Sequence, residues 1–291
     1  MRPDGTRVRD LTAIMQALPY VMPKRYDAQN WAEEYLDEDA IRDYIRAKRR
    51  EGRTVTHMSL LVSAYYRAVL KNPKINYFVM NRRIYKRNHF CFSFVILKTR
   101  ADGTPDETSL KVYLEPEDTV FTVTEKIRST IEKNQNIQHN NDTDRFAKFV
   151  FGVPGLARAV FALAGFLDRH DLLPRSIIEL SPFHTSLFVT NLASINTPCI
   201  FHHCYEFGTT SVFVCMGRPV PDPLSPEGVR KKMSVPGSRK KHMPLGVVMD
   251  ERIATGIEYS RFFAELFRNL KHPESLEEPF NSVLAEKAAV K

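Results

Sequence analysis

The chain has 291 residues, of which 43% are hydrophobic and 26% are charged. These fractions are typical of a soluble globular protein, and the length suits one large domain or two small ones whose core needs no disulfides. The net charge of +8 favours anionic partners without choosing among them. The four cysteines form no Cys-x-x-Cys pair and lie in apolar, strand-like segments, and the start of the chain resembles no signal peptide. Reduced thiols and a cytoplasmic location are therefore expected.

The first half of the chain predicts an arm, two helices and three strands. Residues 1–27 look irregular. Asp37 is suited to cap the first helix, and Asn72-Pro73 is suited to stop the second. The two helices are expected at 37–50 and 56–70. Tyr, Phe, Val and Ile are enriched in the strand-like segments that follow, at 76–80, 83–87 and 89–98.

The second half continues to mix helices and strands without the strict alternation of βαβ units. A strand is expected at 110–115 and a helix at 119–135. Three further strands are expected at 186–192, 199–206 and 210–217, and a last strand at 246–250 precedes a final helix at 257–270. This order predicts one α/β domain built on a mixed β-sheet.

The most informative segment is 244–256, which reads PLGVVMDERIATG and precedes the final helix. It resembles the C-terminal signature of the dihydrolipoyl acyltransferase and chloramphenicol acetyltransferase superfamily, in which a strand ends in Asp-His-Arg-x-x-Asp-Gly. Asp250, Arg252 and Gly256 match that signature. Glu251 stands at the position of the general-base histidine, and Thr255 stands at the position of the structural aspartate. The two departures therefore fall on the positions of the family's general base and of its structural aspartate.

The resemblance covers most of the chain, from about residue 8 to 275. The helix ending in Asn-Pro at 60–73 is similar to an alanine-rich helix of the family. The segment SLFVTNLASI at 186–195 is similar to the family strand that reads TFTISNLG, and Gly217 to the glycine that closes a later strand. These landmarks occur in the order that the family has. The similarity is closer to the lipoyl-dependent acyltransferases than to the chloramphenicol enzymes.

The resemblance implies a two-layer α/β domain with a mixed sheet and covering helices, which assembles as a homotrimer with active sites in channels between subunits. We divide the chain into an arm (1–27), an acyltransferase-like domain (28–275) and a tail (276–291). No lipoylation site is visible, so no covalent lipoyl group is expected on this chain. An acyl carrier or lipoyl domain would have to come from outside.

The resemblance also assigns roles to individual residues. In the family, a hydroxyl at the position of Thr190 stabilises the oxyanion formed when a nucleophile attacks an acyl thioester, while the motif histidine acts as base. The alternative is that Thr190 is only a β-branched strand residue. Glu251 can replace that base if burial raises the pKa of its carboxyl toward neutrality. The alternative is that Glu251 forms an ion pair with Arg252 or Arg25. Thr255 cannot form the charged bridge of the family's aspartate, so the loop after Asp250 is expected to differ.

Other histidines are candidates for the missing base. His184 precedes Thr190 by six residues, and neighbouring residues on a strand at 199–206 would turn only one of His202 and His203 toward a given channel. A buried histidine with satisfied hydrogen bonds is the alternative for each. The same alternation would place Cys199 and His203 on one face and the other two candidate ligands on the opposite face, so no zinc site is expected.

A basic segment precedes the motif strand. Residues 229–242 surround Pro236-Gly237 and suit coenzyme A or acyl-coenzyme A phosphates, or an acidic carrier protein; a solvated hairpin is the alternative. The lysines that would hold coenzyme A are Lys231, Lys232, Lys240 and Lys241. Aromatic residues do not interleave with the basic runs, so nucleic acid is not an expected partner.

The apolar segment 149–167 is about long enough to span a bilayer, but Pro154-Gly155 and Arg158 interrupt it. We expect a short helix followed by a second one that continues to about Arg169. Compared with the family pattern, residues 142–175 look like an insertion. It could cover the mouth of a channel, add to a subunit interface, touch a membrane surface or pack in the core, with membrane contact the less favoured role.

Two functions remain from the sequence. The first is a coenzyme A-dependent acyltransferase with an altered base. The second is a catalytically silent homologue that serves as a trimeric scaffold or ligand-binding protein. The lost histidine favours the second, whereas Thr190 and the basic segment favour the first.

Overall fold

The structure is a computed structural model that describes residues 2–99, 103–135, 151–221 and 241–284. Two early helices agree with the prediction because their signals are local. Asp37 caps α2 by accepting the N–H of Ala40 at 3.0 Å. Thr56 and Ser59 form a capping box at the start of α3, with N···O distances of 2.9 and 3.1 Å. The helices run over Glu38–Arg50 (α2) and His57–Lys71 (α3).

Most predicted strands are also present. Six strands form the main sheet in the order β2-β10-β8-β7-β5-β6, and a short seventh, β9, pairs with β10. The contacts β5–β7 and β7–β8 are parallel and the others are antiparallel, so the sheet is mixed as expected. The strands are Gln29–Asp37 (β2), Phe90–Thr99 (β5), Pro105–Leu114 (β6), Leu187–Asn191 (β7), Val212–Met216 (β8), Val220–Pro221 (β9) and Lys241–Asp250 (β10).

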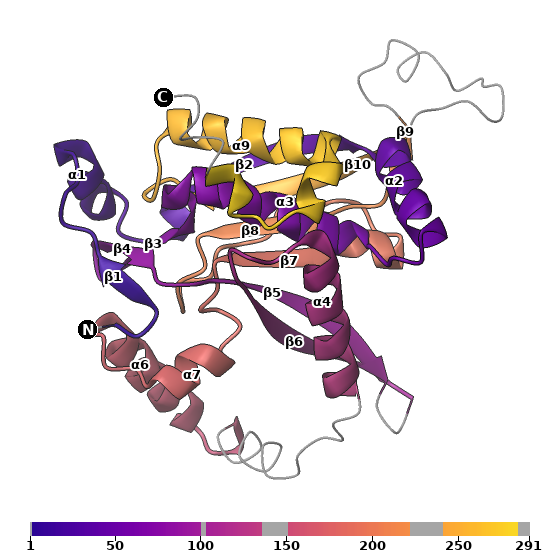
Figure 1. Ribbon diagram of the computed structural model, residues 1–291. Helices are drawn as coiled ribbons and strands as arrows, with labels where there is room; N and C mark the ends of the chain where they lie inside the picture. Colours follow the sequence, from indigo (N-terminus) through magenta and orange to yellow (C-terminus); the bar gives the residue numbers. More distant parts are fainter. Residues whose placement is uncertain (1, 100–102, 136–150, 222–240, 285–291) are drawn as a thin grey trace.

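Helices cover one face of this sheet (Figure 1). The central one is α3, which is buried almost all round and packs against α9 (Gly256–Lys271), while α4 (Val120–Gln135) flanks it. Strand side chains such as Leu187, Val189 and Val214 face these helices and form the main core. Because side chains alternate along a strand, Phe188, Phe213 and Val248 face the opposite side of the sheet.

That opposite face is covered by an irregular segment, residues 199–206, which we call the covering loop. The sequence predicted a strand here, and the prediction is wrong. The loop packs on the sheet instead of pairing with it: Cys204 joins the cluster of Phe188, Phe213 and Val248. Two glycines permit the close approach, since a Cβ on Gly217 or Gly246 would lie 2.5–2.7 Å from the backbone of Cys199 or Ile200.

The prediction that the arm, residues 1–27, is irregular is also wrong. Residues Gly5–Arg7 form β1 and Ala13–Val21 form α1. Strand β1 pairs with β4 (Arg83–Arg87), which pairs with β3 (Tyr77–Met80), so the arm completes a separate three-stranded sheet. The short, polar sequence Gly-Thr-Arg carries no strand signal of its own, and only its partner β4 makes it a strand.

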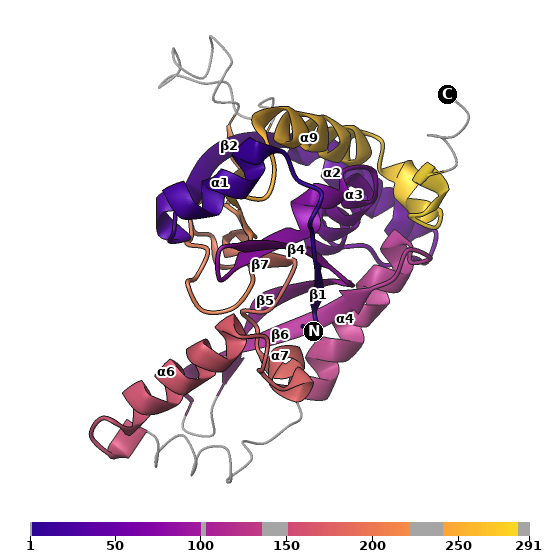
Figure 2. The same ribbon diagram turned by 90° about the vertical axis from the view of Figure 1, so that its left-hand side faces the viewer.

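The predicted insertion, 142–175, contains α6 (Leu156–Arg169), close to the second helix expected there, and the short α7 (Arg175–Leu180) begins at its end. Residues 136–150 lie outside the described part. Figure 2 shows α6 reaching away from the body of the domain. Its side chains Phe161, Leu163 and Phe166 are exposed. In the described ranges, no helix combines the length and apolar character needed to cross a membrane.

The division into domain and tail stays a prediction. Leu270 and, beyond position 275, Leu276 and Phe280 pack in the same core, and the Phe280 ring meets Tyr66 of α3 edge to face with 5.8 Å between ring centroids.

Candidate functional site

The motif loop between β10 and α9 is organised around a buried carboxylate. Asp250 is inaccessible to solvent and accepts hydrogen bonds from Nε and Nη2 of Arg252 at 2.8 and 2.7 Å. Nε of Arg25, from the arm, lies 3.6 Å from the same carboxylate. The Tyr259 hydroxyl donates to the Asp250 carbonyl oxygen at 2.8 Å. Two cations and a tyrosine therefore hold the loop in one arrangement.

Glu251 is the first residue of this loop and is exposed, although Asp250 before it and Arg252 after it are buried. Its N–H donates to the Ala28 carbonyl oxygen at 2.8 Å, which holds its backbone in place. The expected alternative, an ion pair of Glu251 with Arg252 or Arg25, is wrong because Asp250 occupies both arginines. Within the described ranges, the Glu251 side chain has no hydrogen bond or ion pair.

Thr255, at the position of the family's aspartate, helps to hold the end of the motif loop. It is the N-cap residue of α9, and both its N–H and its hydroxyl contact Oε2 of Glu258, at 2.7 and 3.1 Å. Lys74 pairs with the same carboxylate. Gly256 opens the helix beside open space. The helix cap therefore fixes the end of the loop at α9 without a charged side chain at position 255.

Thr190 is half-buried on β7, on the same face of the sheet as Phe188. It pairs with Cys215 of β8, which in turn pairs with Gly246 of β10. Glu251 follows Gly246 by five residues, so it lies about 16 Å further along the strand direction at roughly 3.3 Å per residue. A single chain therefore does not bring Thr190 and Glu251 to one acyl group.

His184 is a buried structural residue. Its Nδ1 is 2.8 Å from Oγ of Ser181 and its Nε2 is 3.1 Å from Oδ2 of Asp168, and the ring is inaccessible to solvent. This matches the alternative of a satisfied histidine. It precedes β7, whereas Thr190 lies near the opposite end of that strand.

His203 is exposed, and His202 stacks on Phe213 with 4.3 Å between ring centroids. The argument that alternation on a strand separates the two histidines does not apply, because the covering loop is not a strand. In the described part of the chain, no group of three His, Cys, Asp or Glu side chains is placed to hold a metal ion.

The structure adds a thiol pair that the sequence did not suggest. Sγ of Cys199 lies 3.5 Å from the carbonyl oxygen of Cys215. The neighbouring Cys199 thiol, and to a lesser degree His202, lowers the pKa of Cys215 in spite of its burial. The Cys215 thiol and burial raise the pKa of Cys199. Cys215 is the neighbour of Thr190 across the sheet.

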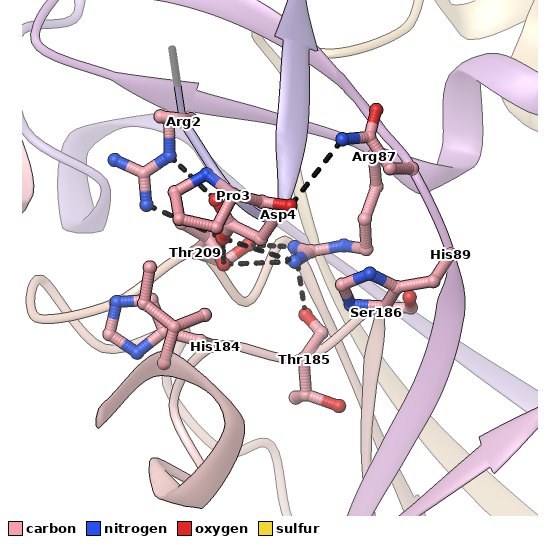
Figure 3. Close-up of polar contacts among 12 residues, drawn as sticks. Arg2, Pro3, Asp4, Arg87, His89, His184, Thr185, Ser186 and Thr209 are labelled. Carbon is pink, nitrogen blue, oxygen red and sulfur yellow. Dashed lines mark hydrogen bonds and ion pairs between the residues drawn. The ribbon is translucent and has the colours of Figure 1, made fainter. Parts of the chain in front are cut away.

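A second polar cluster ties the arm to the insertion (Figure 3). Arg2 donates to Asp4 and to Asp168 of α6, both at 2.8 Å, and all three are buried. Arg87 donates to the Thr209 carbonyl oxygen at 2.8 Å. Burial alone would raise the pKa of Asp4 and Asp168, but their hydrogen-bonded partners, Arg2 for Asp4 and mainly His184 for Asp168, outweigh it and hold both values below the usual range.

Three of the four lysines predicted to hold coenzyme A, Lys231, Lys232 and Lys240, lie outside the described residues. Lys241 is the first residue of β10, is exposed, and donates its backbone N–H to Asp39 at 3.0 Å. The coenzyme A site stays a prediction.

No family model and no curated protein matches the chain. Solved structures do. A truncated catalytic core of the 2-oxoacid dehydrogenase multienzyme complex from Thermoplasma acidophilum is 12% identical, with a TM-score of 0.54, over 92% of this chain and 99% of that one. A chloramphenicol acetyltransferase is 11% identical, with a TM-score of 0.53, over 91% and 99%. The chain therefore has the chloramphenicol acetyltransferase-like fold of 2-oxo acid dehydrogenase acyltransferase catalytic domains, as its motif predicts.

Proposed function

We propose that the chain is an acyltransferase that uses a coenzyme A thioester and completes its active site between copies of itself. The observation that carries this proposal is the motif loop. Asp250, Arg252 and Arg25 hold it from the inside, and it presents one unpaired carboxylate, Glu251, to the outside. A loop held in this way positions Glu251 to act as a base. A neighbouring copy of the chain would supply the Thr190 hydroxyl, because within one chain Thr190 lies too far from Glu251.

In the proposed reaction, Glu251 accepts the proton of an acceptor thiol or hydroxyl as that atom attacks the thioester carbonyl. The Thr190 hydroxyl donates a hydrogen bond to the oxyanion that forms. The carbon–sulfur bond then breaks, and coenzyme A leaves as a thiol with the proton returned from Glu251. In one chain Glu251 is exposed, so the desolvation that would strengthen it as a base has to come from the neighbouring copy.

The same exposure supports the second candidate, a catalytically silent scaffold or ligand-binding protein. An exposed carboxylate is a weak base, and nothing else in the motif loop can replace a histidine. The two candidates differ in the predicted response to substitution of Glu251, which the following assay measures.

We expect acetyl transfer from acetyl-coenzyme A to dihydrolipoamide to be slow and to depend on Glu251. General-base catalysis contributes about 10²–10⁴-fold, so Glu251→Gln should lower the rate toward the uncatalysed level. Glu251→His should raise the rate of acetyl transfer. Thr255→Asp is combined with it in a double variant, because aspartate can replace threonine as the helix cap. Release of the coenzyme A thiol is the readout.

Glu125→Gln, an exposed glutamate on α4, is the matched control and should leave the rate unchanged. Equal rates in wild type, Glu251→Gln and Glu251→His would refute the acyltransferase proposal and favour the silent homologue.

We also expect a trimer rather than a large cage. Apolar side chains are exposed on the covering-loop side of the molecule, Trp31 on β2 and Ile200 and Phe201 on the covering loop, and a neighbouring copy would cover them. Mass photometry should show a species of about three times the chain mass of 33.5 kDa. A monomer, or a particle of about twenty-four chains, would contradict this expectation.

A further inference from the structure

Two of the four free cysteines meet where the covering loop crosses the main sheet. Cys199 lies on the loop and Cys215 lies on β8. Sγ of Cys199 is 3.5 Å from the carbonyl oxygen of Cys215. The other two thiols have different surroundings, since Cys91 lies 3.6 Å from the Thr185 hydroxyl and Cys204 packs in the cluster on the sheet face.

The close approach of Cys199 to Cys215 depends on two glycines of the sheet. Cys215 pairs with Gly246 of β10, so the two residues share one face of the sheet. A Cβ on Gly246 would lie 2.9 Å from Sγ of Cys199, and a Cβ on Gly217 would lie 2.6 Å from the Cβ of Cys199. The Cys199 side chain therefore fills the space that the two glycines leave open beside Cys215.

The two thiols differ in exposure and in acidity. Cys199 is half-buried, so a small oxidant can reach its sulfur, whereas Cys215 is inaccessible to solvent. The Cys199 thiol and, to a lesser degree, His202 lower the pKa of Cys215, which favours its thiolate, the form that attacks another sulfur. In this arrangement, the buried thiolate can complete an oxidation that begins on the accessible thiol.

We propose that Cys199 and Cys215 form a reversible disulfide when the protein meets a hydroperoxide. The peroxide transfers one oxygen atom to Sγ of Cys199, which becomes a sulfenic acid, and the rest of the peroxide leaves as water or an alcohol. Sγ of Cys215 then attacks the sulfur of Cys199. The sulfur–oxygen bond breaks, and the hydroxide leaves as water with the proton of the Cys215 thiol. Two electrons pass from the thiol pair to the peroxide.

The disulfide fastens the covering loop to the sheet beside Thr190, because Cys215 pairs with Thr190 on β7. It closes a loop of about 16 residues, which stabilises the fold by restricting the unfolded chain. The proposal does not depend on the acyltransferase activity, and its test needs no activity assay.

Thiol titration of the full chain before and after treatment with hydrogen peroxide tests the site. In denaturant, the four thiols per chain should fall to two, and peptide mapping should place the bridge between positions 199 and 215. The melting temperature should rise by about 5–10 °C and return when dithiothreitol reduces the bond. Oxidised methionine is not restored by dithiothreitol, so the reversal separates the two effects.

Cys199→Ser and Cys215→Ala should each abolish the bridge and the rise in melting temperature. Cys199→Ser changes a half-buried side chain, so this variant is expected to fold even if Cys215→Ala does not. Cys204→Ala is the matched control, because Cys204 lies on the same loop. On oxidation it should still lose two thiols and gain the same rise in melting temperature.

The proposal is refuted if all four thiols survive an excess of peroxide. It is also refuted if the bridge maps to Cys204 or joins two chains, since the contact between Cys199 and Cys215 would then not direct the reaction. A rise in melting temperature that persists in Cys199→Ser would likewise exclude this disulfide as its cause.

Discussion

Replacing Asp250 with alanine is expected to lower the free energy of unfolding by about 3–5 kcal/mol. The carboxylate is fully buried and faces Arg252 at 2.7 Å and Arg25 at 3.6 Å. Both guanidinium groups are only 3% exposed, so the substitution leaves two buried cations without their anion. Urea unfolding followed by circular dichroism measures the change.

Glu251→Ala is the control for this prediction, because Glu251 is the next residue, exposed and without a side-chain partner in the described ranges. Its effect should stay within about 0.5 kcal/mol. Asp250→Asn keeps the shape and removes the charge, so it should fall between the two. If Asp250→Ala and Glu251→Ala had the same small effect, the ion pairs would not be what holds the motif loop.

The stability of the protein is expected to fall as the pH drops from about 6.5 to about 4 because of His89. Burial, reinforced by the charge of Arg87, lowers the pKa of this histidine from 6.5 to about 4. In that window the unfolded chain binds a proton that the folded chain refuses. The contribution of His89 is therefore complete above pH 6.5 and decreases as the pH falls, by about 3 kcal/mol at pH 4.

His89→Phe keeps a ring beside Tyr113 and removes the titration. The loss of stability between about pH 7 and pH 4 should be about 3 kcal/mol smaller in this variant than in wild type, as measured by urea midpoints along the pH series. The carboxyls of Asp4 and Asp168 have lowered pKa values, so most of their contribution is lost below the unfolded value of 3.8, and this loss is common to wild type and the variant. His203→Gln, at an exposed position, should change nothing. Parallel pH profiles for wild type and His89→Phe would refute the assignment.

The helices of this protein could be predicted from the sequence because their signals are local. Asp37 and Thr56 cap α2 and α3 within one turn, and Asn72 ends α3. Strands that alternate or are strongly apolar, such as β5 and β8, carry a comparable local signal. The fold class followed from the motif at 244–256, because short motifs in a set order persist where overall identity is low.

Elements without a local signal were decided by their partners. Strand β2 has a polar sequence and is a strand because all nine of its residues pair with β10. The covering loop has a strand-like composition, yet both sides of β8 are already paired, with β7 and β10, so it packs on the sheet face instead. Strand β1 exists only through β4.

The candidate sites divide in the same way. The sequence alone located Glu251, Thr255 and Thr190 by their place in a motif. Only the tertiary structure decided what surrounds them: Arg25 reaches Asp250 across 225 positions of the chain, and β-sheet register separates Thr190 from Glu251. A sequence states which charges are present, whereas long-range packing decides which of them meet.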